Sequence, residues 1–256
     1  MPYAVNGDVR IYYERRGTGP PLVLHHGFTG SGQDWVDDGC VEMLEDNFEV
    51  LLLDARGHGR SDKPTDPAAY AMDLRARDVV AVLDDASLAT AHFLGYSMGG
   101  RVGWALGIYT PERFVSLLIG GSGPSPDPPE TIDLWIGWLR DGGVEGVIQG
   151  MEELWGPLPE SFKVVIRTND TSALLAERLA SREEPSLVAA LPSMTTPCLV
   201  FVGSEDPRHA DAKTAAERLP HATFVSLAGL NHLQAAEYKH LIPVVMNFLT
   251  EQIGVH

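Results

Sequence analysis

Basic residues, cysteines and long apolar runs are all scarce in this chain of 256 residues. Lys and Arg together number 19, against 35 Asp and Glu, which gives a formal net charge of −16. Nucleic acid is bound through many Lys and Arg contacts to phosphates, and anionic lipid attracts the same residues, so the charge argues against both. No apolar run approaches the roughly 18 residues that indicate a membrane span. We therefore expect neither a nucleic-acid partner nor a membrane partner.

Only Cys40 and Cys198 are present, so at most one disulfide could form. Cys198 begins the apolar run 198–202, where a free buried thiol is ordinary. Free thiols are typical of reducing compartments. The N-terminal segment also lacks the basic-then-apolar order of a signal peptide. The expected location is the cytoplasm.

Short apolar segments alternate with segments of helical periodicity along most of the chain. This alternation is typical of an α/β fold, in which a mostly parallel sheet carries helices on both faces. The predicted strands lie at residues 3–5, 9–13, 22–24, 48–53, 91–94, 114–119, 196–202 and 223–227, and the main predicted helices at residues 34–45, 72–85, 98–109, 210–219 and 238–253.

One segment interrupts the alternation after the sixth predicted strand. Residues 121–129 contain four prolines, which exclude regular structure there. The pattern that follows is helical until about Ala190. We therefore expect a helical lid inserted over one end of the sheet. Its predicted bounds are residues 122–194, and the core on either side comprises residues 1–121 and 195–256.

The strongest local signal for chemistry is the run Gly95-Tyr-Ser97-Met-Gly99, which lies between a buried strand and a helix. A strand-to-helix turn this tight needs small flanking residues, because its central residue is held in a strained backbone conformation. Such a turn presents a hydroxyl at the carboxyl edge of the sheet. Ser97 is therefore the candidate nucleophile, and a purely structural turn is the alternative.

A serine nucleophile needs a base and an acid that orients the base. Asp206 follows the predicted strand 196–202, and His232 follows the last predicted strand. Because the carboxyl ends of parallel strands meet at one edge of a sheet, the three side chains are expected to lie together. The sequence therefore predicts a Ser97, Asp206 and His232 triad.

Two other carboxylates compete for the role of the acid. Glu205 adjoins Asp206, but the G-x-x-D spacing from Gly203 favours Asp206. Asp127 follows the sixth predicted strand and is the other candidate. Its proline-rich surroundings instead predict a solvated side chain.

Further motifs extend the pattern around the Ser97 turn. His26-Gly27-Phe28 follows the third predicted strand, the run Asp54-Ala-Arg-Gly-His-Gly-Arg-Ser61 follows the fourth, and Pro111-Glu-Arg-Phe114 precedes the sixth. With these motifs the sequence resembles the α/β-hydrolase superfamily over almost the whole chain except the lid. The resemblance implies an α/β-hydrolase fold with an eight-stranded, mostly parallel sheet.

The resemblance also implies a role for each candidate residue. It implies Ser97 as the nucleophile, His232 as the general base and Asp206 as the acid. The backbone N–H groups of Phe28 and Met98 are implied as the oxyanion hole, which agrees with two donors at neighbouring strand ends converging on one oxygen. The implied mechanism requires no metal and no cofactor.

The serine at the turn narrows the substrate class. Haloalkane dehalogenases and epoxide hydrolases of this superfamily attack with a carboxylate, and the serine ether formed by the same attack could not be hydrolysed. We expect a small-molecule ester or lactone as substrate, and favour carboxylic esters with a small or medium acyl chain. Enol-lactone-type lactonases, C–C bond hydrolases and cofactor-free perhydrolases stay open. The candidate substrate-binding residues are Tyr96, Trp135, Trp138 and Trp155.

Two more distant alternatives remain. The run from Gly95 to Arg101 is similar to that of SHCHC synthase, a menaquinone-pathway lyase whose tyrosine and arginine help to bind an acidic substrate. Against the lyase, 12 acidic and 5 basic residues lie between Ser122 and Thr196, whereas a multiply anionic substrate calls for an arginine cluster. The non-enzymatic alternative is a ligand receptor that uses a hydrolase pocket. The oligomeric state is left open.

Overall fold

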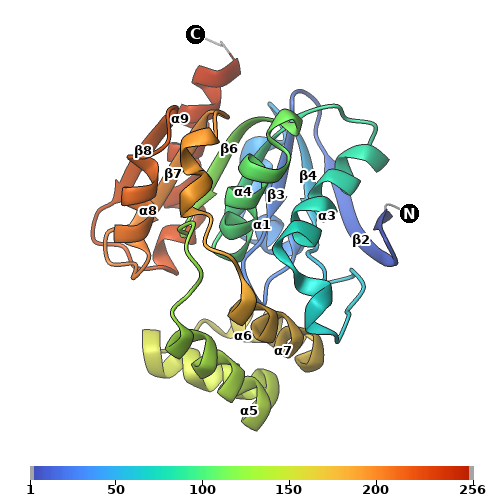
Figure 1. Ribbon diagram of the computed structural model, residues 1–256, viewed down its shortest axis with the longest axis vertical. Helices are drawn as coiled ribbons and strands as arrows, with labels where there is room; N and C mark the ends of the chain where they lie inside the picture. Colours follow the sequence, from blue (N-terminus) through green and yellow to red (C-terminus); the bar gives the residue numbers. More distant parts are fainter. Residues whose placement is uncertain (1–2, 254–256) are drawn as a thin grey trace.

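The computed structural model describes residues 3–253, so Met1 and Pro2 of the N-terminal segment considered above lie outside it, as do residues 254–256. Within these bounds eight strands form one sheet in the order β1-β2-β4-β3-β5-β6-β7-β8 (Figure 1). Each matches a predicted strand. Their bounds are β1 Tyr3–Asn6, β2 Val9–Arg16, β3 Pro21–His25, β4 Glu49–Leu53, β5 Ala91–Tyr96, β6 Phe114–Gly120, β7 Cys198–Gly203 and β8 Ala222–Leu227.

The sheet is mostly parallel, as predicted. Strand β2 pairs antiparallel with both β1 and β4, whereas every pairing from β4 across to β8 is parallel. The carboxyl ends of β3, β5, β7 and β8 therefore meet at one edge, and the loops that follow these strands carry the candidate residues.

Helices cover both faces of the sheet because the buried strands are apolar on both sides. Along β3, Val23 packs with one core cluster, while Leu22 and Leu24 pack with the other, as the two-residue period of a strand requires. The helices on the Val23 face are α3 Met72–Asp85, α4 Met98–Tyr109 and α8 His209–Ala216, and those on the opposite face are α1 Gly32–Asp37, α2 Cys40–Leu44 and α9 Tyr238–Ile253.

One helix prediction was wrong. The segment 34–45, predicted as a single helix, forms the two short helices α1 and α2. Gly39 between them has φ 78°, a left-handed conformation that ends α1 and redirects the chain. By contrast, α3 and α4 have the predicted bounds.

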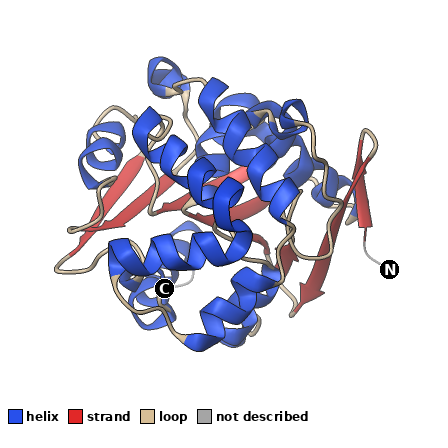
Figure 2. Ribbon diagram, turned by 90° about the horizontal axis from the view of Figure 1, so that it is seen from below, coloured by secondary structure: helices blue, strands red, loops and turns tan. Residues whose placement is uncertain are grey.

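Three helices follow β6 and lie together beyond the carboxyl ends of the strands, at the bottom of Figure 1. They are α5 Pro129–Trp155, α6 Glu160–Arg167 and α7 Thr171–Ala180, and two short 3₁₀ turns, η3 Ser181–Glu183 and η4 Val188–Ser193, lead from them to β7. Helix α5 is kinked at Gly143, where φ is 59°. Figure 2, which views the molecule from this side, shows the helices lying across the strands. We propose that residues 122–194 form the lid and call them so below.

No helix within residues 3–253 is both long enough and apolar enough to cross a bilayer.

Candidate active site

Ser97 lies at the turn between β5 and α4, where the backbone is strained. Its φ is 56°, which is rare for a residue with a side chain. The flanking glycines are required by close packing, because a Cβ at Gly95 would collide with the carbonyl of Gly99, and a Cβ at Gly99 with the carbonyl of His25. The sequence run thus forms the tight turn predicted for it, and Ser97 is only partly buried at the carboxyl edge of the sheet.

The structure brings Ser97, His232 and Asp206 into one hydrogen-bonded row. His232 Nε2 lies 3.0 Å from Ser97 Oγ, and His232 Nδ1 lies 2.5 Å from Asp206 Oδ2. Because an ionised carboxylate can only accept hydrogen bonds, Nδ1 carries the ring proton and donates a hydrogen bond to Asp206. Nε2 is then left to accept the hydrogen of the Ser97 hydroxyl. Glu205, the competing carboxylate, is exposed to solvent.

Asp206 is buried but stays ionised. Burial alone would raise the pKa of its carboxyl, but the hydrogen bond and charge of His232, a backbone N–H and the charge of Arg208 outweigh it, so the pKa is lowered. The Arg208 N–H donates to Asp206 Oδ1 at 2.9 Å. Both carboxylate oxygens therefore have a donor, which fixes the plane of the group against His232.

Tyr96 lies behind the row rather than in front of it. Its side chain is buried, and its hydroxyl donates to the backbone carbonyl of His232 at 2.6 Å. Burial is the largest cause of a raised pKa, so the phenol stays protonated as a donor. This contact favours a role in holding the His232 loop over the predicted contact with substrate.

The loop after β3 passes directly against Ser97. A Cβ at Gly27 would lie 3.5 Å from Ser97 Cβ, so the next residue, Phe28, begins beside the nucleophile. Within residues 3–253 the backbone N–H groups of Phe28 and Met98 have no protein acceptor. Met98 is also the first residue of α4, where the helix dipole favours negative charge. Two donors without a protein acceptor thus belong to residues next to Ser97, Met98 in sequence and Phe28 through the contact of Gly27.

An apolar cluster of the lid lies over this edge of the sheet. Phe28, from the loop after β3, and Leu233, the neighbour of His232, pack against its buried members, which are Leu139, Val147, Ile148, Met151, Leu158, Ile166 and Leu174. The Trp135 ring packs edge-on against the Phe28 ring, with centroids 5.5 Å apart, and also contacts Trp138 and Trp155. All three tryptophans are half-buried. Of the three, Trp135 is the one in aromatic contact with Phe28 of the loop after β3.

Asp127 is not the solvated residue that its proline-rich surroundings predicted. It is half-buried, and its Oδ1 accepts from Arg208 at 2.9 Å. Its Oδ2 lies 3.8 Å from Arg178 of α7, whose guanidinium carbon stands 3.9 Å above the Phe28 ring. An ion network therefore runs from Asp206 through the linker after β6 to Phe28. Sequence spacing gave no signal for it, since its members are far apart in the chain.

Arg101 is buried, and protein groups surround its guanidinium. Its guanidinium pairs with Glu184 at 3.3 Å and donates to the backbone carbonyls of Pro124 and Pro185. These contacts fasten the start and end of the lid to α4. They give Arg101 a structural task, and so weigh against the lyase, in which the equivalent arginine helps to bind an acidic substrate.

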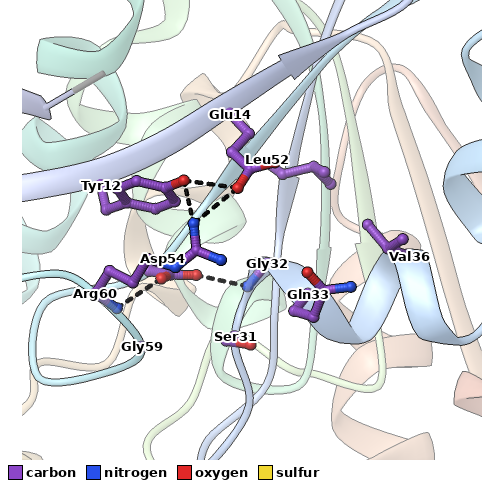
Figure 3. Close-up of a pocket in the computed structure, with 10 residues that line it drawn as sticks. All are labelled: Tyr12, Glu14, Ser31, Gly32, Gln33, Val36, Leu52, Asp54, Gly59 and Arg60. Carbon is purple, nitrogen blue, oxygen red and sulfur yellow. Dashed lines mark hydrogen bonds and ion pairs between the residues drawn. The ribbon is translucent and has the colours of Figure 1, made fainter. Parts of the chain in front are cut away.

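A small separate cleft of about 90 Å³ lies between β2, α1 and the loop after β4 (Figure 3). Figure 3 shows Asp54 between the backbone of Gly32 and that of Arg60, whose N–H groups donate to it at 2.8 and 2.7 Å. The lining holds no member of the triad, and its polar groups bind one another. We therefore assign it to the packing of this loop.

The chain is similar in sequence to known hydrolases. A family model described as the alpha/beta hydrolase fold matches residues 20–142. The chain is 27% identical to 3-oxoadipate enol-lactonase 2 of Acinetobacter baylyi, over 93% of this chain and 94% of that protein. It is 39% identical over 119 residues to an Azorhizobium caulinodans protein that bears the name of the carbamate hydrolase RutD, a match that spans 46% of this chain and 43% of that relative.

Solved structures agree with the family match. The enol-lactonase from Burkholderia xenovorans superposes with a TM-score of 0.86 at 24% identity, over 97% of this chain and 100% of that one. At this identity the likeness is one of fold.

Proposed function

Because this chain belongs to the α/β-hydrolase superfamily and is a hydrolase, we propose that it cleaves carboxylic esters of small or medium acyl chain through an acyl-enzyme on Ser97. The observation that carries the proposal is the hydrogen-bonded row from Ser97 Oγ to His232 Nε2 and from His232 Nδ1 to Asp206. A serine becomes nucleophilic when a base in hydrogen-bond reach takes its proton and an acid orients that base.

Acylation begins when His232 Nε2 takes the proton of Ser97 while Oγ bonds to the ester carbonyl carbon. The imidazolium that forms is stabilised by Asp206, whose ionised state the lowered pKa supports. The tetrahedral intermediate then expels the alcohol oxygen, which leaves with the proton from His232. Asp206 keeps its hydrogen bond with His232 and its negative charge throughout, so it orients the imidazole and compensates its positive charge.

The negative charge that develops on the carbonyl oxygen needs donors at the moment of attack. The N–H groups of Phe28 and Met98 supply them, the latter reinforced by the positive end of α4. In comparable sites the loss of one such donor lowers kcat by about 10²–10³. In the second half of the reaction His232 deprotonates a water, which attacks the acyl carbon, and Ser97 leaves with the proton.

A lactone is the second candidate substrate. It is a cyclic ester, so the same attack opens the ring and the alcohol stays attached to the acyl group. The match to 3-oxoadipate enol-lactonase 2, which covers 93% of this chain, favours this candidate over C–C bond hydrolysis and perhydrolysis.

The lid and the cellular location complete the proposal. The Trp135, Trp138 and Trp155 cluster would form the apolar wall against which the acyl chain packs. The cytoplasmic location stays a prediction, supported by the thiols of Cys40 and Cys198, which are free and buried and whose pKa burial raises to about 12.

The test is turnover of p-nitrophenyl acetate and butyrate by Ser97→Ala. We expect release of p-nitrophenol to fall to the solution background, and a fluorophosphonate to label the wild type but not the variant. Ser193→Ala, which alters an exposed serine of η4, is the matched control and should keep full activity. Near-normal turnover by a folded Ser97→Ala would overturn the proposal, and a single slow turnover by the wild type would favour the receptor.

A further inference from the structure

Thr29, the residue after the candidate oxyanion donor Phe28, has an unusual backbone conformation. Its φ is 70°, and its side chain is β-branched and buried. A β-branched residue in this region is a true outlier, and such strain, on the order of 1–3 kcal/mol, persists only where the surroundings hold it. The groups that hold Thr29 therefore also help to set the direction of the chain at Phe28.

The core holds one side of Thr29. Its N–H donates to His58 Nε2 at 3.2 Å. Burial, followed by the charge of His26, holds the pKa of His58 well below its usual range, so the ring is neutral. His58 Nδ1 lies 3.1 Å from the carbonyl of Arg56 and donates to it, which leaves Nε2 as an acceptor.

The lid holds the other side. Asn169, which lies between α6 and α7, donates from Nδ2 to the carbonyl of Thr29 at 2.7 Å. The same amide nitrogen lies 3.1 Å from the carbonyl of Val165 and 3.2 Å from that of Ile166, in the last turn of α6. Three carbonyl oxygens around one nitrogen identify it as the NH₂ group of the side chain.

One amide therefore joins a helix end of the lid to the loop that carries an oxyanion donor. Helix α7 adds a second contact to the same loop, because Arg178 covers the Phe28 ring. The strained residue is thus fixed on one side by the core and on the other by a lid that is 140 residues away in sequence. When the lid is docked, all three restraints act together.

We propose that Asn169 is a positioning residue that sets the oxyanion hole: by holding the carbonyl of Thr29 it keeps the N–H of Phe28 aimed at the position of the developing oxyanion. The proposal rests on the proposed function, since it assumes that Phe28 stabilises a tetrahedral intermediate on Ser97. It makes docking of the lid and completion of the catalytic site a single event. A misplacement of about 1 Å can lower a rate by about 10²-fold. Loss of a contact one residue from the donor can therefore lower kcat measurably.

The competing explanation is that Asn169 only caps α6. Thr168 provides the matched control, because its hydroxyl donates to the same Val165 carbonyl at 2.7 Å while the residue is exposed. Thr168→Ala removes a cap hydrogen bond from α6 and leaves the Thr29 contact in place.

The experiment compares Asn169→Ala, Asn169→Asp and Thr168→Ala in the full chain with p-nitrophenyl acetate. Both Asn169 variants lose the donor, and the isosteric carboxylate would also face the carbonyl oxygens. We expect kcat to fall about 10- to 100-fold with KM within about twofold, the pattern of an interaction made in the transition state. Thr168→Ala should keep kcat within about twofold.

Inhibition by phenylboronic acid separates positioning from a loss of structure. Its boron takes the Ser97 oxygen, the hydroxyl proton passes to His232, and a boronate oxygen then occupies the oxyanion hole. The inhibition constant should rise in the same proportion as kcat falls in the Asn169 variants. In a Thr29→Gly background, where positive φ carries no strain, Asn169→Ala should cost less kcat than in the wild type.

The opposite results are equally specific. Equal losses in Thr168→Ala and Asn169→Ala, a change in KM alone, unchanged boronate inhibition, or an undiminished loss in the Thr29→Gly background would each overturn the inference. If Ser97→Ala is inactive while Asn169→Ala has wild-type kcat, this inference fails and the proposed function stands. If Ser97→Ala retains turnover, both fail.

Discussion

Ser97, Asp206 and His232 lie on loops that follow strands of the sheet, whereas the lid above them reaches the core through scattered side-chain contacts. In the loops Asp206 and His232 each have more than one partner: Asp206 accepts from His232 and from the backbone N–H of Arg208, and the hydroxyl of Tyr96 donates to the carbonyl of His232. In the lid the three tryptophans are half-buried and contact one another through ring edges and faces. The hydrogen bonds of the loops fix the positions of polar groups, whereas the ring contacts of the lid fill space.

The lid is itself held in two ways. Behind α7, Arg75 of α3 lies 3.1 Å from both Glu177 and Glu184, and these side chains are 9% exposed or less. The ion pairs of α5 and α6 lie on the outer surface, as in Arg167 with Glu145, where the side chains are 41% and 61% exposed. Buried pairs are costly to break, whereas exposed pairs contribute little. The α7 side, with the end of α6 that Asn169 holds, should therefore stay docked while α5 and the first turn of α6 adapt to substrate.

The largest expected effect comes from replacing Asp206, the candidate acid. Asp206→Asn should lower kcat by about 10⁴, because an asparagine leaves His232 in the wrong tautomer while the geometry is kept. Glu205→Gln alters the adjacent exposed carboxylate and should leave kcat within about twofold. Steady-state kinetics with p-nitrophenyl butyrate measures both. The reverse ranking would mean that the acid has been misassigned and that the hydrogen bonds of the loops do not define the site.

The anchor of the lid gives the next largest effect. Arg75→Met leaves Glu177 and Glu184 buried without this cation, so we expect the free energy of unfolding to fall by about 3–5 kcal/mol. Arg77→Met on the same helix removes an exposed pair with Asp73 and should change it by less than about 0.5 kcal/mol. Urea denaturation measures both. Equal effects would remove the distinction between the two sides of the lid.

The strands, and the loops after them that carry Ser97, Asp206 and His232, could be predicted from the sequence. Strands are short apolar runs bounded by turn residues, and the tight turn at Ser97 needs glycine at fixed positions, so both leave local signals. The order of parallel strands then predicts that Asp206 and His232 share an edge with Ser97. The division at Gly39 was missed because a glycine inside a helical pattern is not by itself a stop.

The lid contacts could not be predicted, because they depend on how distant segments meet. Nothing in the sequence around Asn169 distinguishes it from an ordinary residue of a helix connection, and its partner Thr29 lies in the first core segment. Asp127 was expected to be exposed to solvent because the residues next to it in sequence are mostly prolines, and composition describes only such neighbours. Its neighbours in space, Arg208 and Arg178, become visible only after folding.

Acyl selectivity tests whether the lid acts by filling space. Trp135→Ala removes the ring that contacts Phe28, so longer acyl chains should fit better. We expect the ratio of kcat/KM for p-nitrophenyl hexanoate over acetate to rise roughly tenfold, about the value of a methylene or two in an apolar pocket. Leu134→Ala, on the same helix but exposed, should leave the ratio unchanged. An unaltered ratio in Trp135→Ala, and likewise in Trp138→Ala and Trp155→Ala, would contradict a lid that sets chain length.

The smallest expected effect is in the pH dependence of stability, and it contrasts a buried carboxylate of the site with an exposed one of the lid. Interactions with His232 and Arg208 outweigh burial and lower the pKa of Asp206, so its folded pKa lies below the unfolded value of about 3.9. Its contribution to stability is therefore present above that pH and lost as the pH falls through the folded pKa.

The free energy of unfolding of wild type minus that of Asp206→Asn should accordingly be steady from pH 7 to 5 and shrink below about pH 4. Hydrogen bonds from Lys163 and Arg167 also lower the pKa of Glu160, but this group is fully exposed and screened by solvent. Glu160→Gln should therefore follow the wild-type profile throughout. Urea denaturation at pH 7, 5, 4 and 3 measures the three profiles. The wild-type free energy of unfolding minus that of Asp206→Asn could also stay unchanged down to pH 3. That result would mean that the partners of Asp206 do not bind its charged form more tightly than its neutral form.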